Sequence, residues 1–268
     1  MRLIPYFPRK VNGAIKRLYP RYGLIPSDVL LPSFPKSGNT WMRFIWANII
    51  NIEERDGEEA DFGAINGVVG SEYDLNIYAS YESEILPRLV KTHMEYSSSR
   101  FRDNRAVYLI RHPGDVMLSY FDYRKARRSS RDEAQSLSHF LRNEQHGVPA
   151  WGRHVKSWLA QDPIVIRYED LKRDAEAEVL DMFRQLGEDH VPEDSMREAV
   201  RRSAFDNMKR IESEQGLEGD RELDDDFTFV RKGAPGAWYN QISDEDRDYI
   251  VHMIAKQGFT DLYPSPTE

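Results

Sequence analysis

Short apolar runs alternate along this chain with segments of helical spacing. The apolar runs predict buried strands over residues 29–34, 88–92, 106–110 and 164–166. Apolar positions that recur every three or four residues predict helices over residues 40–52, 113–127, 132–143, 151–160, 175–186, 193–203 and 243–255. Because strands and helices alternate, we expect an α/β fold: one domain with a central parallel β-sheet flanked by helices.

Length and charge predict where the domain begins and which segments are exposed loops. The chain has 268 residues and no convincing linker, so we expect an N-terminal arm over 1–27 and one domain over 28–268. Acidic stretches at 53–61 and 218–226 predict exposed loops. Residues 1–22 carry six basic residues and no acidic one. Such an arm either contacts an anionic membrane surface or lies solvated beside the domain, and we favour the solvated arm.

Composition excludes several kinds of chemistry. The chain has no cysteine, which rules out disulfides, a thiolate nucleophile and a cysteine-ligated zinc. The net charge of −8 argues against general nucleic-acid binding, although it leaves room for a local anion site. Most of the histidines have no ligand-like spacing, so no metal is expected. No apolar run reaches the length of a signal peptide or a membrane span, and we expect a cytoplasmic protein.

The segment 35–41, Pro-Lys-Ser-Gly-Asn-Thr-Trp, joins the first predicted strand to the first predicted helix. A helix N-terminus binds anions through its free backbone N–H groups, and Lys36 adds a positive charge beside it. The spacing departs from a Walker A loop, in which the glycine directly precedes the lysine. The residues therefore suit a phosphate or sulfate. A strand–turn–helix with a solvated lysine remains the alternative that the pattern alone leaves open.

Four segments of the chain, in the same order, resemble the PAPS-dependent sulfotransferases (PAPS is 3′-phosphoadenosine 5′-phosphosulfate). Residues 35–41 resemble the family's 5′-phosphosulfate loop, and Val90–His93 resembles its segment with the catalytic histidine. Residues 108–120 resemble the strand and helix that bind the 3′-phosphate, and 229–238 resemble the C-terminal Arg-Lys-Gly loop. The resemblance extends over about residues 28–258. It implies the P-loop-like sulfotransferase fold and a cytosolic-type, bacterial-like member.

The resemblance also implies roles for individual residues. His93 would be the general base, and Lys36 would stabilise the leaving group. Where many relatives have threonine, this chain has Asn39, whose amide can also donate a hydrogen bond. The residues that the resemblance places around the cofactor are Lys36, Ser37, Gly38, Asn39, Thr40, Trp41, Arg111, Ser119, Tyr168, Ser203, Phe205, Arg231, Lys232 and Gly233.

The implied reaction moves a sulfuryl group from PAPS to a hydroxyl of a small-molecule or glycosylated acceptor, leaving PAP, the 3′,5′-bisphosphate. Histidine suits proton removal because its pKa lies near neutrality. The loops over about 56–86 and 212–230 are candidates for acceptor contacts. Two alternatives remain: a small-molecule kinase that uses ATP on the same strand–loop–helix, and a non-catalytic nucleotide-binding protein.

Overall fold

The structure is a computed structural model of the chain. It describes residues 23–71, 83–101, 103–127, 136–216, 223–224, 227–230 and 233–264. The basic segment 1–22, on which the predicted arm rests, lies outside these residues. Parts of both predicted acceptor loops, 56–86 and 212–230, also lie outside them. So does most of the acidic stretch 218–226.

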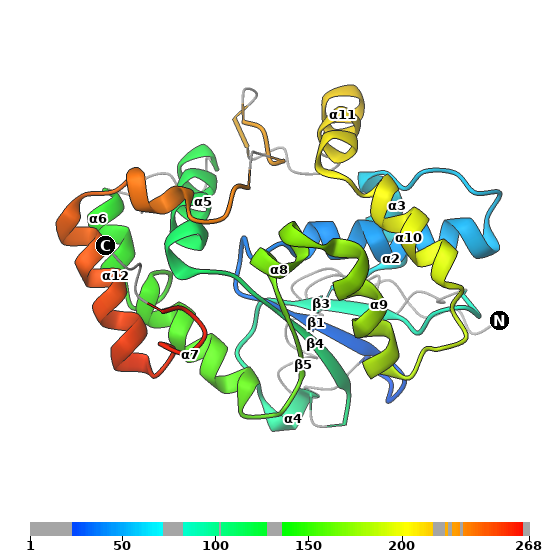
Figure 1. Ribbon diagram of the computed structural model, residues 1–268, viewed down its shortest axis with the longest axis horizontal. Helices are drawn as coiled ribbons and strands as arrows, with labels where there is room; N and C mark the ends of the chain where they lie inside the picture. The colour runs from blue at the N-terminus through cyan, green and yellow to red at the C-terminus, as the bar shows by residue number, and fades with distance from the viewer. Residues whose placement is uncertain are drawn as a thin grey trace.

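Parallel strands form the centre of the molecule. The five strands lie in the order β2-β3-β1-β4-β5, and all of their pairings are parallel (Figure 1). Their bounds are β1 Val29–Pro32, β2 Gly70–Ser71, β3 Leu89–Thr92, β4 Arg105–Ile110 and β5 Ile164–Arg167. The four longer strands confirm the runs predicted from sequence. β2 is two residues long, too short to leave an apolar pattern.

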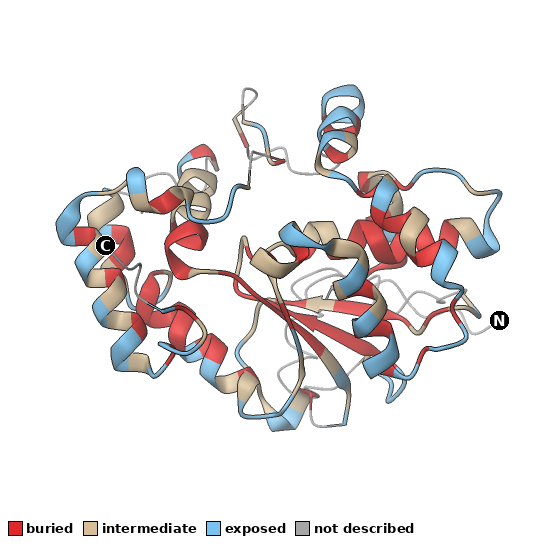
Figure 2. Ribbon diagram, in the orientation of Figure 1, coloured by how far each residue is buried: buried red, intermediate tan, exposed pale blue. Residues whose placement is uncertain are grey.

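Both faces of the sheet are covered, which explains why its strands are apolar without alternation. In β1, Val29 and Leu31 belong to one buried cluster, whereas Leu30 belongs to the other. In β4, Tyr108 points into the second cluster while its neighbours enter the first. Figure 2 shows the strands as a buried band between more exposed helices. The sheet therefore lies inside a three-layer α/β domain, as predicted.

Helices build the two outer layers. The first cluster packs the sheet against α2, α3, α9, α10 and α11, and the second packs it against α5, α6, α7 and α12. The bounds of all helices are α2 Asn39–Glu54, α3 Phe62–Val68, α4 Ser98–Phe101, α5 Pro113–Ala126, α6 Leu137–Arg142, α7 Val148–Leu159, α8 Tyr168–Arg173, α9 Ala175–Leu186, α10 Glu193–Arg202, α11 Phe205–Gln215, the 3-10 helix η3 Ala237–Asn240 and α12 Asp244–Gln257.

The predicted helices agree with these bounds apart from their ends. α6 begins later than the predicted 132–143, and residues 132–135 lie outside the described part. The acidic stretch 53–61 is largely exposed, as predicted, but it is a loop only in part, because α2 extends through Glu54 and Ala60 is fully buried. The backbone N–H of Ala60 donates to Oδ1 of buried Asn48 at 2.9 Å, which draws this stretch against α2.

Candidate active site

Four strands deliver candidate residues to the same edge of the sheet. β1 ends at Pro32, shortly before Lys36, and β3 ends directly before His93. β4 ends directly before Arg111, and β5 ends directly before Tyr168. Carboxyl ends of parallel strands are the usual ligand-binding edge of an open α/β sheet. The order of the sheet therefore collects residues that are as much as 132 positions apart in sequence.

The helix-start loop, residues 33–38, leads from β1 into α2. Gly38 caps α2 with a φ of 101°, and no side chain caps the helix. A Cβ at Gly38 would come within 2.7 Å of Cδ2 of Tyr168, so the backbone approaches that ring as only glycine allows. Lys36 also has a positive φ, 69°, which is a strained value for a residue with a side chain. The loop presents an uncapped helix N-terminus, and its conformation carries a local energetic cost.

Buried polar atoms without partners surround this loop. Among the described residues, Oγ of Ser37, Nε1 of Trp41 and Nε of Arg111 are buried and have no hydrogen-bond partner. An unpaired buried polar group costs about 1–3 kcal/mol, so such groups mark places where a bound group completes the bonding. These three donors, together with the α2 N-terminus, fit an anionic ligand such as a phosphate ester.

Arg111 and Tyr168 form one packed unit beside the loop. The guanidinium carbon of Arg111 lies 4.3 Å from the centre of the Tyr168 ring, and Nη1 donates to the carbonyl of Lys36 at 3.3 Å. The phenol of Tyr168 donates to the carbonyl of Gly233 at 3.0 Å. Burial raises the pKa of that phenol and keeps it a donor. Tyr168 thereby joins the helix-start loop to the C-terminal region predicted to bind the cofactor.

Lys36 lies against aromatic rings. Its Nζ is 3.6 Å from the centre of the Phe229 ring and 4.9 Å from that of Tyr123. The two rings meet edge to face, with centres 6.3 Å apart. A lysine ammonium over aromatic faces is held by cation–π attraction and keeps its charge.

His93 is fixed in one tautomer. Its Nδ1 lies 2.7 Å from the carbonyl oxygen of Ser33, so Nδ1 must donate and the neutral ring carries its acceptor at Nε2. Burial, together with the positive charges of Lys91, Arg43 and Lys36, lowers the pKa of His93 from 6.5 to about 4, although its hydrogen bond to Ser33 acts in the opposite direction. At neutral pH the ring is therefore an unprotonated base.

A second histidine supports the same region. His154 is buried, and its Nδ1 lies 2.9 Å from the hydroxyl of Tyr108. Burial, and then the neighbouring His93, lower the pKa of His154 to about 3. The pairing of Tyr108 with His154 could not be predicted from sequence, because the two residues lie in β4 and α7.

The C-terminal loop, residues 233–240, is held by contacts that the sequence did not reveal. The carboxylate of Asp115 accepts the backbone N–H groups of Gly236 at 2.8 Å and Trp238 at 3.1 Å. A Cβ at Gly114 would lie 2.2 Å from the Trp238 ring, so that indole packs directly on the helix backbone. Asp115 follows Gly114 in the first turn of α5. In the sequence it looks like an ordinary acidic residue near a helix N-terminus, so its role in holding the loop could not be predicted.

The remaining predicted residues divide into three groups. Arg231 and Lys232 lie outside the described residues. Gly233 is at the loop, and Ser119 and Thr40 lie half-buried in α5 and α2. Trp41 and Phe205 flank Lys172, whose Nζ lies 5.7 Å and 5.6 Å from their ring centres. This places two of the aromatic residues that the resemblance puts around the cofactor beside one position.

Two predicted side-chain contacts differ from expectation. The amide of Asn39 is buried and donates to the carbonyl of Leu31 and to Oγ of Ser33, both at 3.3 Å. Both amide hydrogens are thus used inside the loop, so residue 39 can offer an anion its backbone N–H. Ser203 is fully buried and accepts from Nδ2 of Asn48 at 3.1 Å. Its hydroxyl joins α10 to α2, so the geometry does not support a direct cofactor contact through it.

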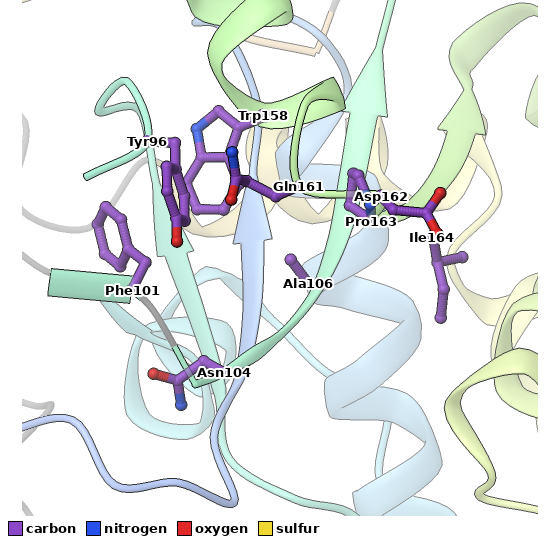
Figure 3. A pocket seen from close by; sticks show the side chains of 9 residues that line it. All are labelled: Tyr96, Phe101, Asn104, Ala106, Trp158, Gln161, Asp162, Pro163 and Ile164. Carbon is purple, nitrogen blue, oxygen red and sulfur yellow. The ribbon is translucent and has the colours of Figure 1, made fainter. Parts of the chain in front are cut away.

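A separate cavity of about 210 Å³ lies at the opposite edge of the sheet. Tyr96, Phe101 and Trp158 form its aromatic side, with Ala106 and Ile164 at the starts of β4 and β5 (Figure 3). The candidate active site follows the other ends of these strands. This cavity is therefore not part of it.

The described residues also bear on other kinds of site. No group of three or more metal-ligating side chains occurs among them. In the same part of the chain, no helix combines the length and apolar character that crossing a membrane requires.

Comparisons with known proteins identify the family of this chain. The family profile described as "Sulfotransferase domain" matches residues 26–261. "Sulfotransferase 1 family member D1" of Rattus norvegicus is 28% identical over 257 residues, covering 85% of this chain and 84% of that protein. "Flavonol 3-sulfotransferase" of Flaveria bidentis is 26% identical, covering 88% and 84%.

Among solved structures, mouse sulfotransferase SULT7A1 complexed with PAP superposes with a TM-score of 0.65 at 19% identity, covering 92% of this chain and 88% of that one. Retinol dehydratase in complex with androsterone and PAP has the same TM-score at 19% identity, covering 94% and 85%. These structures show the shared fold. Because the family profile covers most of the chain, the chain belongs to the sulfotransferase family and is a sulfotransferase.

Proposed function

We propose that this sulfotransferase uses PAPS and transfers its sulfuryl group to the hydroxyl of a small-molecule or glycosylated acceptor. One observation carries the proposal: a neutral histidine with a fixed tautomer lies at the same sheet edge as an uncapped helix N-terminus and buried donors without partners. The solved structures of similar fold that contain PAP support the choice of cofactor.

The residues of this chain fit such a cofactor. The α2 N-terminus, Ser37 and Gly38 would hold the 5′-phosphosulfate end, where a phosphate finds backbone N–H groups. Arg111 would hold the 3′-phosphate with Ser119, Arg231 and Lys232, because a guanidinium pairs with phosphate oxygens in a planar fork. Trp41 and Phe205 would flank the adenine. When bound, PAPS supplies the sulfuryl group.

Two residues of the chain would do the chemical work. His93 takes the proton of the acceptor hydroxyl at Nε2, while Nδ1 stays hydrogen bonded to the Ser33 carbonyl. The ammonium of Lys36 stabilises the negative charge that develops on the leaving phosphate oxygen. Burial, with the positive charges around it, keeps the pKa of His93 low, which favours the free base over the imidazolium.

Substitution tests these roles. We expect Lys36→Ala and His93→Ala each to lower kcat by about 10²–10³-fold, because each removes a charge-stabilising or proton-accepting group. The measurement is transfer from labelled PAPS to a panel of phenols, alcohols and sugars. Exposed Lys256 and His252 of α12 provide the matched controls Lys256→Ala and His252→Ala, which should retain the wild-type rate.

Ligand binding and pH separate the proposal from a kinase or a binding protein. PAP should raise the Tm of wild type, whereas ATP with Mg²⁺ should not. The acid limb of kcat/KM should lie near pH 4, since His93 stays unprotonated down to its lowered pKa. Stabilisation by ATP with Mg²⁺ alone would favour a kinase. Full turnover by His93→Ala would exclude it as the base.

A further inference from the structure

Glu212 is a buried acid of α11 that none of the predicted roles uses. It is 8% exposed, and its two carboxylate oxygens accept successive backbone N–H groups, from Phe229 at 2.5 Å and from Val230 at 2.8 Å. Burial of a carboxylate is costly unless hydrogen bonds compensate it, and backbone donors to an ionised acid form strong bonds. The acid therefore fixes the chain at Phe229 and Val230.

The backbone that Glu212 holds, at Phe229 and Val230, lies next to Lys36. The Phe229 ring, whose own backbone N–H is bound by Glu212, is 3.6 Å from Nζ of Lys36. The Tyr123 ring completes the aromatic contact from α5. Cation–π attraction to these two rings therefore contributes to the position of the Lys36 ammonium.

Packing alone does not explain an acid at this position. Met208 and Ile211 of α11 enter the first buried cluster, and an apolar side chain beside them would bury without cost. Among the described residues, the two N–H groups that donate to it account for the carboxylate. Glu214, on the same helix, shows the ordinary alternative: it is exposed and pairs with Arg210 at 3.0 Å.

We infer that Glu212 is a positioning residue for Lys36: by holding the backbone at Phe229 and Val230, it sets the ring that holds the Lys36 ammonium in place. The inference rests on the proposed function for its effect on catalysis, but the positioning itself does not. A displacement of about 1 Å at a catalytic group can cost about 10²-fold in rate, so such support matters to turnover.

Chemical labelling tests the positioning without an acceptor. Acylation of the protein with acetic anhydride, followed by mass spectrometry, gives the reaction rate of each lysine. We expect Glu212→Gln, Glu212→Ala and Phe229→Leu to raise the rate at Lys36 about fivefold, the factor expected when a cation–π contact is lost. The matched control Glu214→Gln should leave it unchanged.

Lys172 serves as an internal reference. Its Nζ lies 5.6 Å from the ring of Phe205, at the start of α11, so it would report general loosening of that helix. An unchanged rate at Lys172 with a raised rate at Lys36 supports the inference. The double variant Glu212→Gln/Phe229→Leu should add nothing to the single changes, because both act through the same ring.

Measurements of turnover then distinguish the positioning role of Glu212 from the proposed function. If wild type transfers sulfuryl groups, Glu212→Gln should lower kcat about tenfold with little change in the KM for the acceptor. Wild-type labelling of Lys36 in Glu212→Gln and Phe229→Leu would overturn the inference, even where Glu212→Ala fails to fold. Raised labelling without any PAPS turnover by wild type would instead contradict the proposed function and leave the positioning role standing.

Discussion

The helix-start loop, 33–38, and the C-terminal loop, 233–240, meet at one site but are held in place by different means. The first is built mostly from neighbours in sequence, since Gly38 caps the helix that follows it and the amide of Asn39 binds Ser33. His93 and Arg111 add contacts to its carbonyl groups. The second depends on distant side chains, since Asp115 binds backbone groups 121 and 123 positions away. An anion site can thus combine a locally encoded half with a half that exists only after the domain has folded.

Acidification should have the largest effect. It acts on the helix-start loop through His93, and on the C-terminal loop through His112. Nδ1 of His112 accepts the N–H of Gly114 at 3.1 Å, and its ring stacks on Trp238 with centres 4.7 Å apart. Burial, with the charges of Arg111 and Arg167 beside it, lowers its pKa to about 4. The unfolded chain takes up this proton near pH 6.5, so the stabilisation is present above pH 6.5 and falls as pH drops toward 4.

The free energy of unfolding should fall by about 3 kcal/mol through His112 over that range, since one pKa unit corresponds to about 1.4 kcal/mol. Urea denaturation at pH 7 and pH 4.5 measures it. His112→Asn keeps an N-cap acceptor without titrating, so its stability should vary less with pH. An equal pH dependence in wild type and His112→Asn would contradict the assignment.

The substitution Gly114→Ala disturbs the C-terminal loop directly. The added Cβ would meet three atoms of the Trp238 ring between 2.2 and 2.7 Å, so the indole must move. Overpacking of this kind costs about 2–3 kcal/mol, and it should weaken PAP binding through displacement of the loop. Thermal unfolding and calorimetric titration with PAP measure both. A variant with wild-type Tm and affinity would show that the loop does not depend on this contact.

The same contrast explains how far the sequence predicted the site. His93 and Arg111 directly follow apolar strands and Lys36 follows one after a short loop, so their place at one sheet edge could be predicted from the carboxyl ends of parallel strands. The supporting residues could not be. Glu212 and Asp115 become recognisable only when α11 and α5 face the backbone that they bind. Parallel strands were predictable because burial on both faces leaves continuous apolar runs, whereas β2 was too short to do so.

Gly38→Ala disturbs the helix-start loop first and reaches the C-terminal loop through Tyr168. A φ of 101° is unfavourable for alanine, and its Cβ would lie 2.7 Å from Tyr168. We expect a loss of about 2 kcal/mol in stability, together with a loss of PAP affinity. Gly38→Ala and Gly114→Ala should differ in which segment of the chain becomes less ordered. Hydrogen exchange should increase at α2 in Gly38→Ala and at the C-terminal loop in Gly114→Ala, and the reverse pattern would contradict the division.

Tyr168→Phe should have the smallest effect and tests where the two loops join. The ring packs on Gly38 and beneath Arg111, and phenylalanine keeps that packing. Only the bond to the carbonyl of Gly233 is lost, at a cost of about 1 kcal/mol. PAP affinity should therefore fall about fivefold while the helix-start loop keeps its exchange protection. The buried hydroxyl of Tyr263 has no hydrogen-bond partner among the described residues, so Tyr263→Phe is the matched control and should bind PAP as wild type does. Equal affinities in the two variants would mean that the loops are coupled through the ring of Tyr168, with no contribution from its hydroxyl.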